Sequence, residues 1–149
     1  MVEDMIMLIS TKGRYALRVM IDLAEHQTEG FIPLKIIADR QEISEKYLES
    51  IIKLLVKAKL LNGVRGKGGG YKLTRHPEEY TVRSILQLTE DSLAPVSCLE
   101  HGADSCPRMA ECRTLPLWQG LNQVINDYLD HITVADLMRR DAPGNDYVI

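Results

Sequence analysis

Residues 43–74 read ISEKYLESIIKLLVKAKLLNGVRGKGGGYKLT, and two patterns in this stretch decide the fold. Ser44 is a residue type that caps helix N-termini, and the apolar residues that follow it recur at helical spacing over residues 45–58. The apolar positions are Leu48, Ile51, Ile52, Leu55 and Ala58. Residues 61–65 and 71–74 read as two strands with a glycine-rich turn between them. The stretch therefore predicts a helix followed by a β-hairpin.

The preceding residues predict two more helices. Ser10 or Thr11 caps a helix that runs to about His26, with one apolar face. That face comprises Ala16, Val19, Met20, Leu23 and Ala24. Pro33 opens a second helix, LKIIADRQE, because proline is tolerated where the N–H groups have no helical partner. A short turn at residues 42–43 leads into the third helix, so the order is helix-turn-helix and then a wing.

Charge is distributed unevenly along the 149 residues, although the net charge is only −3. Residues 7–76 carry 13 Lys and Arg against 7 Asp and Glu, whereas the rest of the chain carries 5 against 14. A basic front half indicates a polyanionic partner, and a cationic hairpin tip without bulky side chains can approach a DNA backbone or enter a minor groove. The glycine-rich turn lacks the Walker pattern and opens no helix, so a nucleotide-binding loop is not indicated.

Composition is typical of a single globular domain. Hydrophobic residues make up 45% of the chain, and no apolar run approaches the ~20 residues of a membrane span. The start, MVEDMIMLIS, is acidic and does not read as a secretory signal, so we expect a cytoplasmic protein. Neither a nucleophile–base pair nor a metal-hydrolase motif occurs, so we expect no enzyme.

The second half of the chain predicts a long amphipathic helix. Thr81 caps a short helix, a loop follows over residues 91–112, and the long helix occupies residues 114–132. Thr133 caps a last helix, VADLM, and residues 139–149 have no pattern. The stripe on the long helix comprises Leu117, Leu121, Val124, Ile125, Tyr128, Leu129 and Ile132. It either packs on its own domain or forms a dimer seam, which we favour because helix-turn-helix proteins commonly bind palindromic sites as dimers.

All three cysteines lie in the predicted loop, at Cys98, Cys106 and Cys112. An odd number cannot pair completely within one chain, and a reducing compartment would leave the thiols free, metal-bound or redox-active. Zinc sites usually have paired cysteines at short spacing and four ligands, and bare redox thiols need nearby cations such as Arg108 and Arg113. Thiolates are also the chief ligands of iron–sulfur clusters.

Several motifs together resemble the Rrf2 family of bacterial transcription regulators. They are STKGRYAL from residue 10, ISEKYLESIIKLLVKAKLL from residue 43, VRGKGGGYKL from residue 64 and ITVADLM from residue 132, with a cysteine loop before a long helix. The resemblance spans about residues 7–138. It implies a homodimer with a winged helix-turn-helix that binds double-stranded operator DNA. The most similar members hold an iron–sulfur cluster at three loop cysteines.

Two departures from those cluster-binding members concern the ligands. Seven residues rather than five lie between the first two cysteines, a spacing that resembles iron-responsive members. Leu115 stands where those members have a ligating histidine. The fourth ligand is therefore open among His101, a carboxylate such as Glu111, a group of the other subunit, or a small molecule. The cluster type, [2Fe–2S] or [4Fe–4S], is open as well.

The resemblance and the residue pattern together give the candidate DNA contacts. The start of the third helix should face base edges in the major groove, where Glu49 can accept from cytosine. Arg65 resembles the wing residue that enters an A·T-rich minor groove, and the start of the first helix should meet phosphates. The full set comprises Thr11, Lys12, Arg14, Ser44, Lys46, Tyr47, Glu49, Arg65, Gly66, Lys67, Gly68, Gly69 and Tyr71.

We thus expect a mainly α fold with a small β-hairpin. Residues 7–93 form the winged helix-turn-helix domain, residues 94–114 the cluster-binding loop, residues 115–138 the dimerisation helix with the short terminal helix, and residues 139–149 a loose tail. The expected function is a DNA-binding regulator, a repressor, whose DNA affinity or specificity is set by an iron–sulfur cluster at Cys98, Cys106 and Cys112 and which senses iron, cluster or redox status. The alternative is an iron–sulfur or thiol electron-transfer protein that uses the winged helix only as a scaffold.

Overall fold

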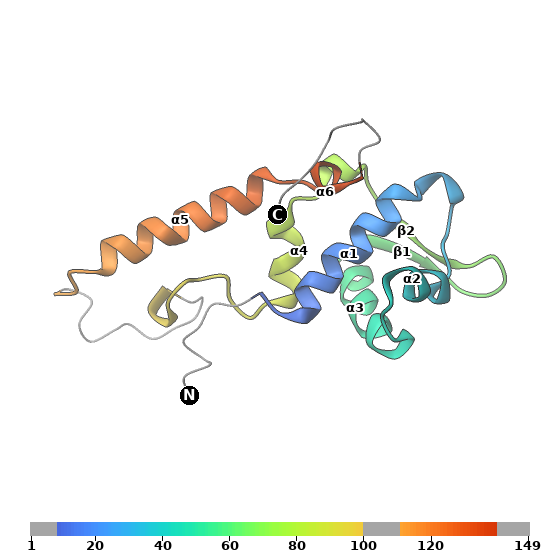
Figure 1. The fold of residues 1–149 in the computed structure, drawn as a ribbon, viewed down its shortest axis with the longest axis horizontal. Helices are drawn as coiled ribbons and strands as arrows, with labels where there is room; N and C mark the ends of the chain where they lie inside the picture. The colour runs from blue at the N-terminus through green and yellow to red at the C-terminus, as the bar shows by residue number, and fades with distance from the viewer. Residues whose placement is uncertain (1–8, 100–110, 140–149) are drawn as a thin grey trace.

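The computed structural model describes residues 9–99 and 111–139. The elements in chain order are α1 (Thr11–Glu25), η2 (Gln27–Glu29), α2 (Leu34–Gln41), α3 (Glu45–Lys57), β1 (Leu61–Val64), β2 (Gly70–Leu73), η3 (Pro77–Glu79), α4 (Val82–Thr89), η4 (Ser97–Leu99), α5 (Leu115–His131) and α6 (Val134–Leu137). Figure 1 shows α5 extending from the body as an arm, with the β1–β2 hairpin at the opposite end of the molecule. The fold is mainly α with one small hairpin, as predicted.

Side-chain caps begin four of the helices where the sequence predicted them. Ser10 Oγ accepts a hydrogen bond from the N–H of Gly13 at 3.0 Å, which selects Ser10 rather than Thr11 as the cap of α1. Ser44, Thr81 and Thr133 cap α3, α4 and α6 in the same way. Each cap satisfies an N–H that has no partner within its helix.

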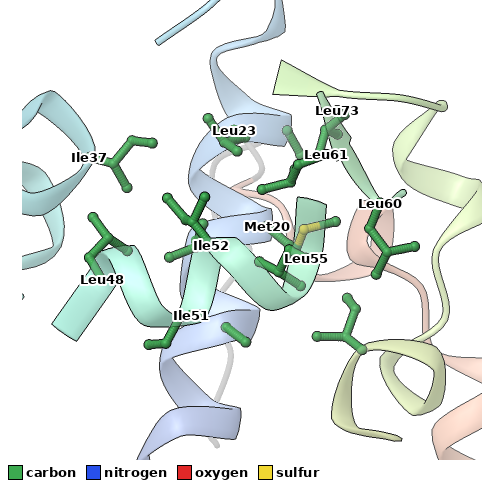
Figure 2. Close-up of a cluster of buried hydrophobic side chains, with 14 of the residues drawn as sticks. Met20, Leu23, Ile37, Leu48, Ile51, Ile52, Leu55, Leu60, Leu61 and Leu73 are labelled. Atoms are coloured by element: carbon green, nitrogen blue, oxygen red, sulfur yellow. The ribbon is translucent and has the colours of Figure 1, made fainter. Parts of the chain in front are cut away.

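The core forms where α1, α2, α3 and the base of the hairpin meet. Figure 2 shows their apolar side chains pointing toward one another. The predicted apolar face of α1 is entirely buried, and so are Leu48, Ile51, Ile52 and Leu55 of α3. Val134 of α6 also belongs to this cluster, because α6 folds back onto α1. Burial of this apolar surface holds α3 and the wing in a fixed relation.

The hairpin is tied to the body along β2. Its register pairs Leu61 with Leu73 and Val64 with Gly70. On the other side of β2, the backbone N–H and carbonyl groups of Tyr71 and Ile32 exchange hydrogen bonds of 2.9 Å. At Gly70, φ is +148° and a Cβ would lie 2.3 Å from the carbonyl carbon of Ile32, so only glycine fits this close approach.

Candidate nucleic-acid interface

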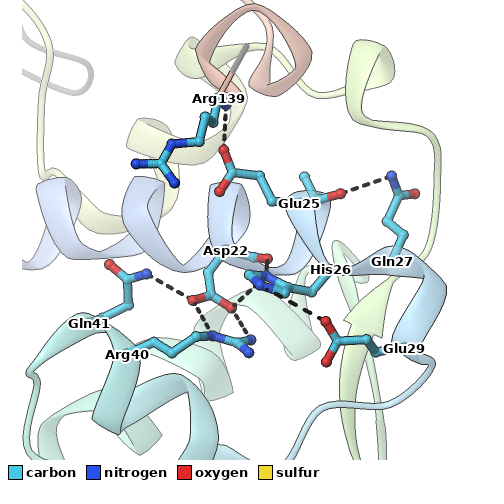
Figure 3. Close-up of polar contacts among 9 residues, drawn as sticks. Asp22, Glu25, His26, Gln27, Glu29, Arg40, Gln41 and Arg139 are labelled. Carbon is cyan, nitrogen blue, oxygen red and sulfur yellow. Dashed lines mark hydrogen bonds and ion pairs between the residues drawn. The ribbon is translucent and has the colours of Figure 1, made fainter. Parts of the chain in front are cut away.

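A buried carboxylate fixes α2 against α1. Asp22 of α1 accepts hydrogen bonds from Arg40 Nε at 3.0 Å and Nη2 at 2.6 Å, and from Gln41 Nε2 at 2.8 Å (Figure 3). The hydrogen bonds from Arg40 to Asp22 raise the pKa of Arg40 above its ordinary value. Because α2 and α3 are joined by only a short turn, this network also sets the position of α3.

The start of α3 presents an exposed polar face. Ser44, Lys46 and Glu49 are exposed, and Glu49 forms an ion pair with Lys53 at 3.6 Å. Tyr47 is half-buried instead, because its ring packs edge-on against Tyr15 of α1 with the ring centroids 5.8 Å apart. Ser44, Lys46 and Glu49 therefore offer hydrogen-bond donors and acceptors to a partner. Tyr47 instead joins α3 to α1.

The wing tip is a narrow glycine turn with two cations. Gly69 N–H donates to the carbonyl of Gly66 at 2.9 Å, and Gly66 and Gly68 have φ of +89° and +79°. Arg65 and Lys67 are exposed, as are Gly66 and Gly68. Gly69 is buried inside the turn, where a Cβ would lie 2.2 Å from the carbonyl oxygen of Val64. The tip therefore combines positive charge with little bulk.

A groove of about 550 Å³ runs between α3 and the wing. Its walls are Glu49, Ile52, Lys53, Val56, Lys57, Gly63, Val64, Arg65 and Tyr71. Lys53 and Lys57 were missed by the sequence reasoning, although they follow Glu49 at helical spacing of four and eight residues and so share its face. With Arg65 on the facing wall, the groove is lined by three cations at its rim.

The start of α1 differs from a free anion-binding helix end. The N–H and hydroxyl of Ser10 donate to the carboxylate of Glu90, and the N–H of Gly13 is taken by Ser10 Oγ. Thr11 and Arg14 remain exposed, with Arg14 Nη2 donating to Thr11 Oγ1 at 3.2 Å, and Lys12 is half-exposed. A phosphate at this end would therefore meet side chains rather than the N–H groups of Ser10 and Gly13.

Two of the three cysteines lie in the described part of the chain. Cys98 belongs to η4, Cys112 precedes α5, and both are free and partly exposed. Cys106 and His101 lie outside the described residues. Cys112 Sγ is 3.4 Å from Thr114 Oγ1. This hydrogen bond, with lesser ones from the backbone N–H groups of Thr114 and Leu115, lowers the pKa of the Cys112 thiol. Within residues 9–99 and 111–139, no group of three or more His, Cys, Asp or Glu side chains is arranged to hold a metal ion.

The predicted stripe on α5 is open to solvent. Leu117, Leu121, Val124 and Tyr128 are exposed, with Val124 at 63% and Tyr128 at 64%, while Ile125 and Leu129 are half-buried. The whole of α5 is described, and none of its residues is fully buried. Arg83 of α4 fixes the helix by hydrogen bonds to Asn126 at 3.0 Å and Asp130 at 3.4 Å. Among the described helices, none combines the length and apolar character that crossing a membrane requires.

The exposed polar face of α3, the cationic wing and the core that holds both in place define a winged helix-turn-helix DNA-binding protein. Residues 9–140 match the Rrf2 family, described as "Iron-dependent Transcriptional regulator", and the chain belongs to this family. It is a transcription regulator of the type represented by its relatives.

One such relative is the HTH-type transcriptional regulator IscR of Aliivibrio salmonicida, which is 40% identical over 132 residues, covering 89% of this chain and 77% of the relative. The solved structure of T. potens IscR has a TM-score of 0.68 at 38% identity, covering 87% of this chain and 85% of that one. The structure of CymR (YrzC), the global cysteine regulator of B. subtilis, has a TM-score of 0.70 at 38% identity, covering 87% and 95%. These relatives are transcription regulators rather than enzymes or electron carriers. They confirm the expectation that the chain is no enzyme, and they set the electron-transfer alternative aside.

Proposed function

We propose that this regulator is a homodimeric, cytoplasmic repressor whose affinity for operator DNA is set by an iron–sulfur cluster at Cys98, Cys106 and Cys112. The chemistry of the described donors fits such a group. Cys98 and Cys112 are free thiols with partial exposure, and the hydrogen bonds that lower the pKa of Cys112 favour the thiolate, the form that binds iron. A bound cluster would give the regulator a cluster-loaded form, and this form would be lost when iron is scarce or oxidants attack the cluster.

The DNA-reading role is assigned to α3 and the wing. The exposed Ser44, Lys46 and Glu49 are suited to base edges in the major groove, where Glu49 accepts from cytosine N4. Arg65 at the narrow tip is suited to an A·T-rich minor groove. One phosphate backbone would then pass along the groove between them, past Lys53 and Lys57.

A short covalent and hydrogen-bonded path joins the cysteine segment, here residues 91–99 with Cys98, to the proposed phosphate contacts at the start of α1. The segment begins directly after Glu90, whose carboxylate holds Ser10 through hydrogen bonds of 2.7 and 2.6 Å. Thr11, Lys12 and Arg14 follow Ser10 within four positions. A change in the backbone position of the cysteine segment would therefore reach the proposed phosphate contacts through one side chain.

Homodimer formation is assigned to the open stripe of α5. Its exposed side chains are large and apolar, and a second copy of the same stripe would cover them with matching chemistry. The two winged helix-turn-helix domains of such a dimer, related by a two-fold axis, would bind a palindromic operator.

The experiment is anaerobic purification with an absorption spectrum and iron and sulfide assays on one sample. Visible bands with equal iron and sulfide, and DNA binding that changes when the cluster is removed, are expected. Cys106→Ala should lose colour while remaining folded and dimeric, and Ser97→Ala, beside Cys98, serves as the control that keeps it. A protein that stays colourless after reconstitution contradicts the cluster. Zinc in that sample would indicate a zinc site. A sample without zinc would indicate redox-active thiols, a role that the lowered pKa of Cys112 favours.

A further inference from the structure

We infer that Tyr80 is a positioning residue that fixes the wing on the helical body and so sets where Arg65 meets DNA. The inference rests on the proposed role of Arg65 and extends it to a buried residue that touches no DNA. Tyr80 is completely buried between η3 and α4, shortly after the hairpin in the chain.

One hydroxyl group holds both ends of the hairpin. Tyr80 Oη donates to the carbonyl of Leu60 at 2.9 Å, immediately before β1. It accepts from the backbone N–H groups of Thr74 and Arg75, both at 2.9 Å, immediately after β2. Thr74 Oγ1 also lies within hydrogen-bond distance of Tyr80 Oη, at 3.1 Å. The Arg75 guanidinium lies over the Tyr80 ring, 5.2 Å from its centroid. Both strand ends thus bond to one oxygen atom, in addition to the direct bonds from Thr74 to the carbonyls of Lys59 and Leu60.

That atom is anchored outside the hairpin. The carbonyl of Tyr80 accepts from the N–H of Val134 at 2.9 Å, and the N–H of Val82 donates to the carbonyl of Ile132 at 2.8 Å. Thr81 and Thr133 form a β-bridge between these two bonds. Val134 is itself completely buried in the main core. The base of the wing is therefore attached to the point where α5 ends and α6 begins.

The wing depends on such attachments because it is small. Each strand has four residues, and a two-stranded hairpin is marginally stable alone in water. Near β2, the Ile32–Tyr71 pair gives a second attachment, but it holds only one strand. Loss of the Tyr80 hydroxyl would remove its hydrogen bonds to the start of β1 and the end of β2 together. The core packing of Leu61 and Leu73 would then hold these ends with fewer directional contacts, and the tip would spread over more positions.

The test is a double-mutant cycle of Tyr80→Phe with Arg65→Ala. The probe is a duplex selected by the wild-type protein from a random-sequence pool, compared with a version carrying G·C flanks, and affinity is measured by fluorescence anisotropy. Tyr80→Phe keeps the ring and is expected to weaken binding about fivefold through the hydrogen bonds that it loses. In the Arg65→Ala background the same change should cost less than about twofold, because the positioned group is already absent. Tyr15→Phe removes a hydroxyl from a half-exposed ring and should leave affinity unchanged.

Hydrogen exchange gives a second readout. The Thr74 and Arg75 amides, which donate to Tyr80 Oη, should exchange faster in Tyr80→Phe, while the amides of α3 keep their protection. Equal losses of affinity in both backgrounds, or unchanged affinity with Arg65→Ala still effective, would overturn the inference. Arg65→Ala without effect on wild-type affinity would instead refute the proposed wing contact. If Tyr80→Phe does not fold, the cycle is run with Thr74→Val, which removes the contact of Thr74 Oγ1 with the Tyr80 hydroxyl together with its bonds to the carbonyls of Lys59 and Leu60, and which must show the same non-additivity.

Discussion

Glu90 and Ser10 are 80 positions apart in the sequence, yet both carboxylate oxygens of Glu90 accept hydrogen bonds from Ser10. The backbone N–H of Ser10 donates to one oxygen at 2.7 Å, and its hydroxyl donates to the other at 2.6 Å. Thr89 Oγ1 adds a third bond at 2.9 Å. A carboxylate at this place also interacts favourably with the positive end of α1. The first turn of α1 is thus held by the last turn of α4.

Gly13 is the residue that leaves room for this contact. A Cβ there would lie 2.6 Å from Glu90 Oε2 and 3.0 Å from Thr89 Oγ1. Gly13→Ala should therefore lower the free energy of unfolding by about 1 kcal/mol, although alanine is the better helix former, because the carboxylate loses its bonds to Ser10. In a Glu90→Ala background the same substitution should be neutral or stabilising. Urea unfolding of the four proteins measures this, and additive costs would contradict it.

The Asp22 network predicts a larger effect. The Asp22 side chain is 1% exposed and accepts three hydrogen bonds from Arg40 and Gln41, so Asp22→Ala leaves a guanidinium without its partner. We expect a loss of about 3 kcal/mol in the free energy of unfolding, by analogy with other broken buried pairs. Asp39→Ala is the matched control: its carboxylate is 65% exposed and 3.8 Å from Lys35, and its loss should cost less than about 0.5 kcal/mol. Similar losses in the two variants would show that Asp22 does not anchor α2.

Lys59 occupies a conformation that favours glycine. Its φ is +65°, and α3 ends with the N–H of Leu60 bonded to the carbonyl of Leu55 and the N–H of Lys59 bonded to that of Val56, both at 2.9 Å. This is the Schellman arrangement, in which glycine usually follows the helix. Lys59→Gly should raise stability by about 1 kcal/mol because a left-handed side-chain residue carries that cost. Lys57→Gly, inside the helix, should lower it by a similar amount. A destabilising Lys59→Gly in thermal unfolding would contradict the assignment.

Most of the fold could be predicted from local sequence patterns. The caps at Ser10, Ser44, Thr81 and Thr133 depend on residues three positions away, and the apolar face of α1 depends on helical periodicity, so each could be predicted from a short window. Contacts between distant segments could not be predicted in this way. The Ser10–Glu90 bonds exist only once α1 and α4 are packed, and the Tyr80 hydroxyl reaches the carbonyl of Leu60, 20 positions away, only once the hairpin has formed.

The candidate interface divides along the same line. Exposure of Arg65, Lys67 and Lys46 follows from charge and local structure. The packing of Tyr47 on Tyr15 and the groove that brings Lys53 and Lys57 opposite the wing depend on how α3, α1 and the hairpin meet. A helical projection would have placed both lysines beside Glu49, but only the packed wing turns that face into one wall of a groove.

Arg65→Ala should weaken DNA binding and remove the preference for A·T-rich flanks. The attraction of an arginine into a minor groove depends on groove width, so the loss should be confined to the A·T-flanked duplex. Lys67→Ala, two residues along the same tip, should weaken both duplexes alike and lower the salt dependence of binding. Competition binding with the two duplexes at several salt concentrations separates these outcomes. A flank preference that survives Arg65→Ala would assign the minor-groove contact elsewhere.

Val124→Glu should convert the proposed homodimer into a folded monomer. Val124 is 63% exposed in the centre of the α5 stripe, so the substitution costs little within one chain but places two carboxylates at a two-fold seam. Size-exclusion chromatography with light scattering should give half the wild-type mass, and circular dichroism should be unchanged. Affinity for a palindromic duplex should fall, while binding to a single half-site should not. Gln119→Glu adds the same charge at an exposed position of α5 outside the stripe and should remain dimeric. A Val124→Glu protein with the wild-type dimer mass would show that α5 covers something other than its own copy.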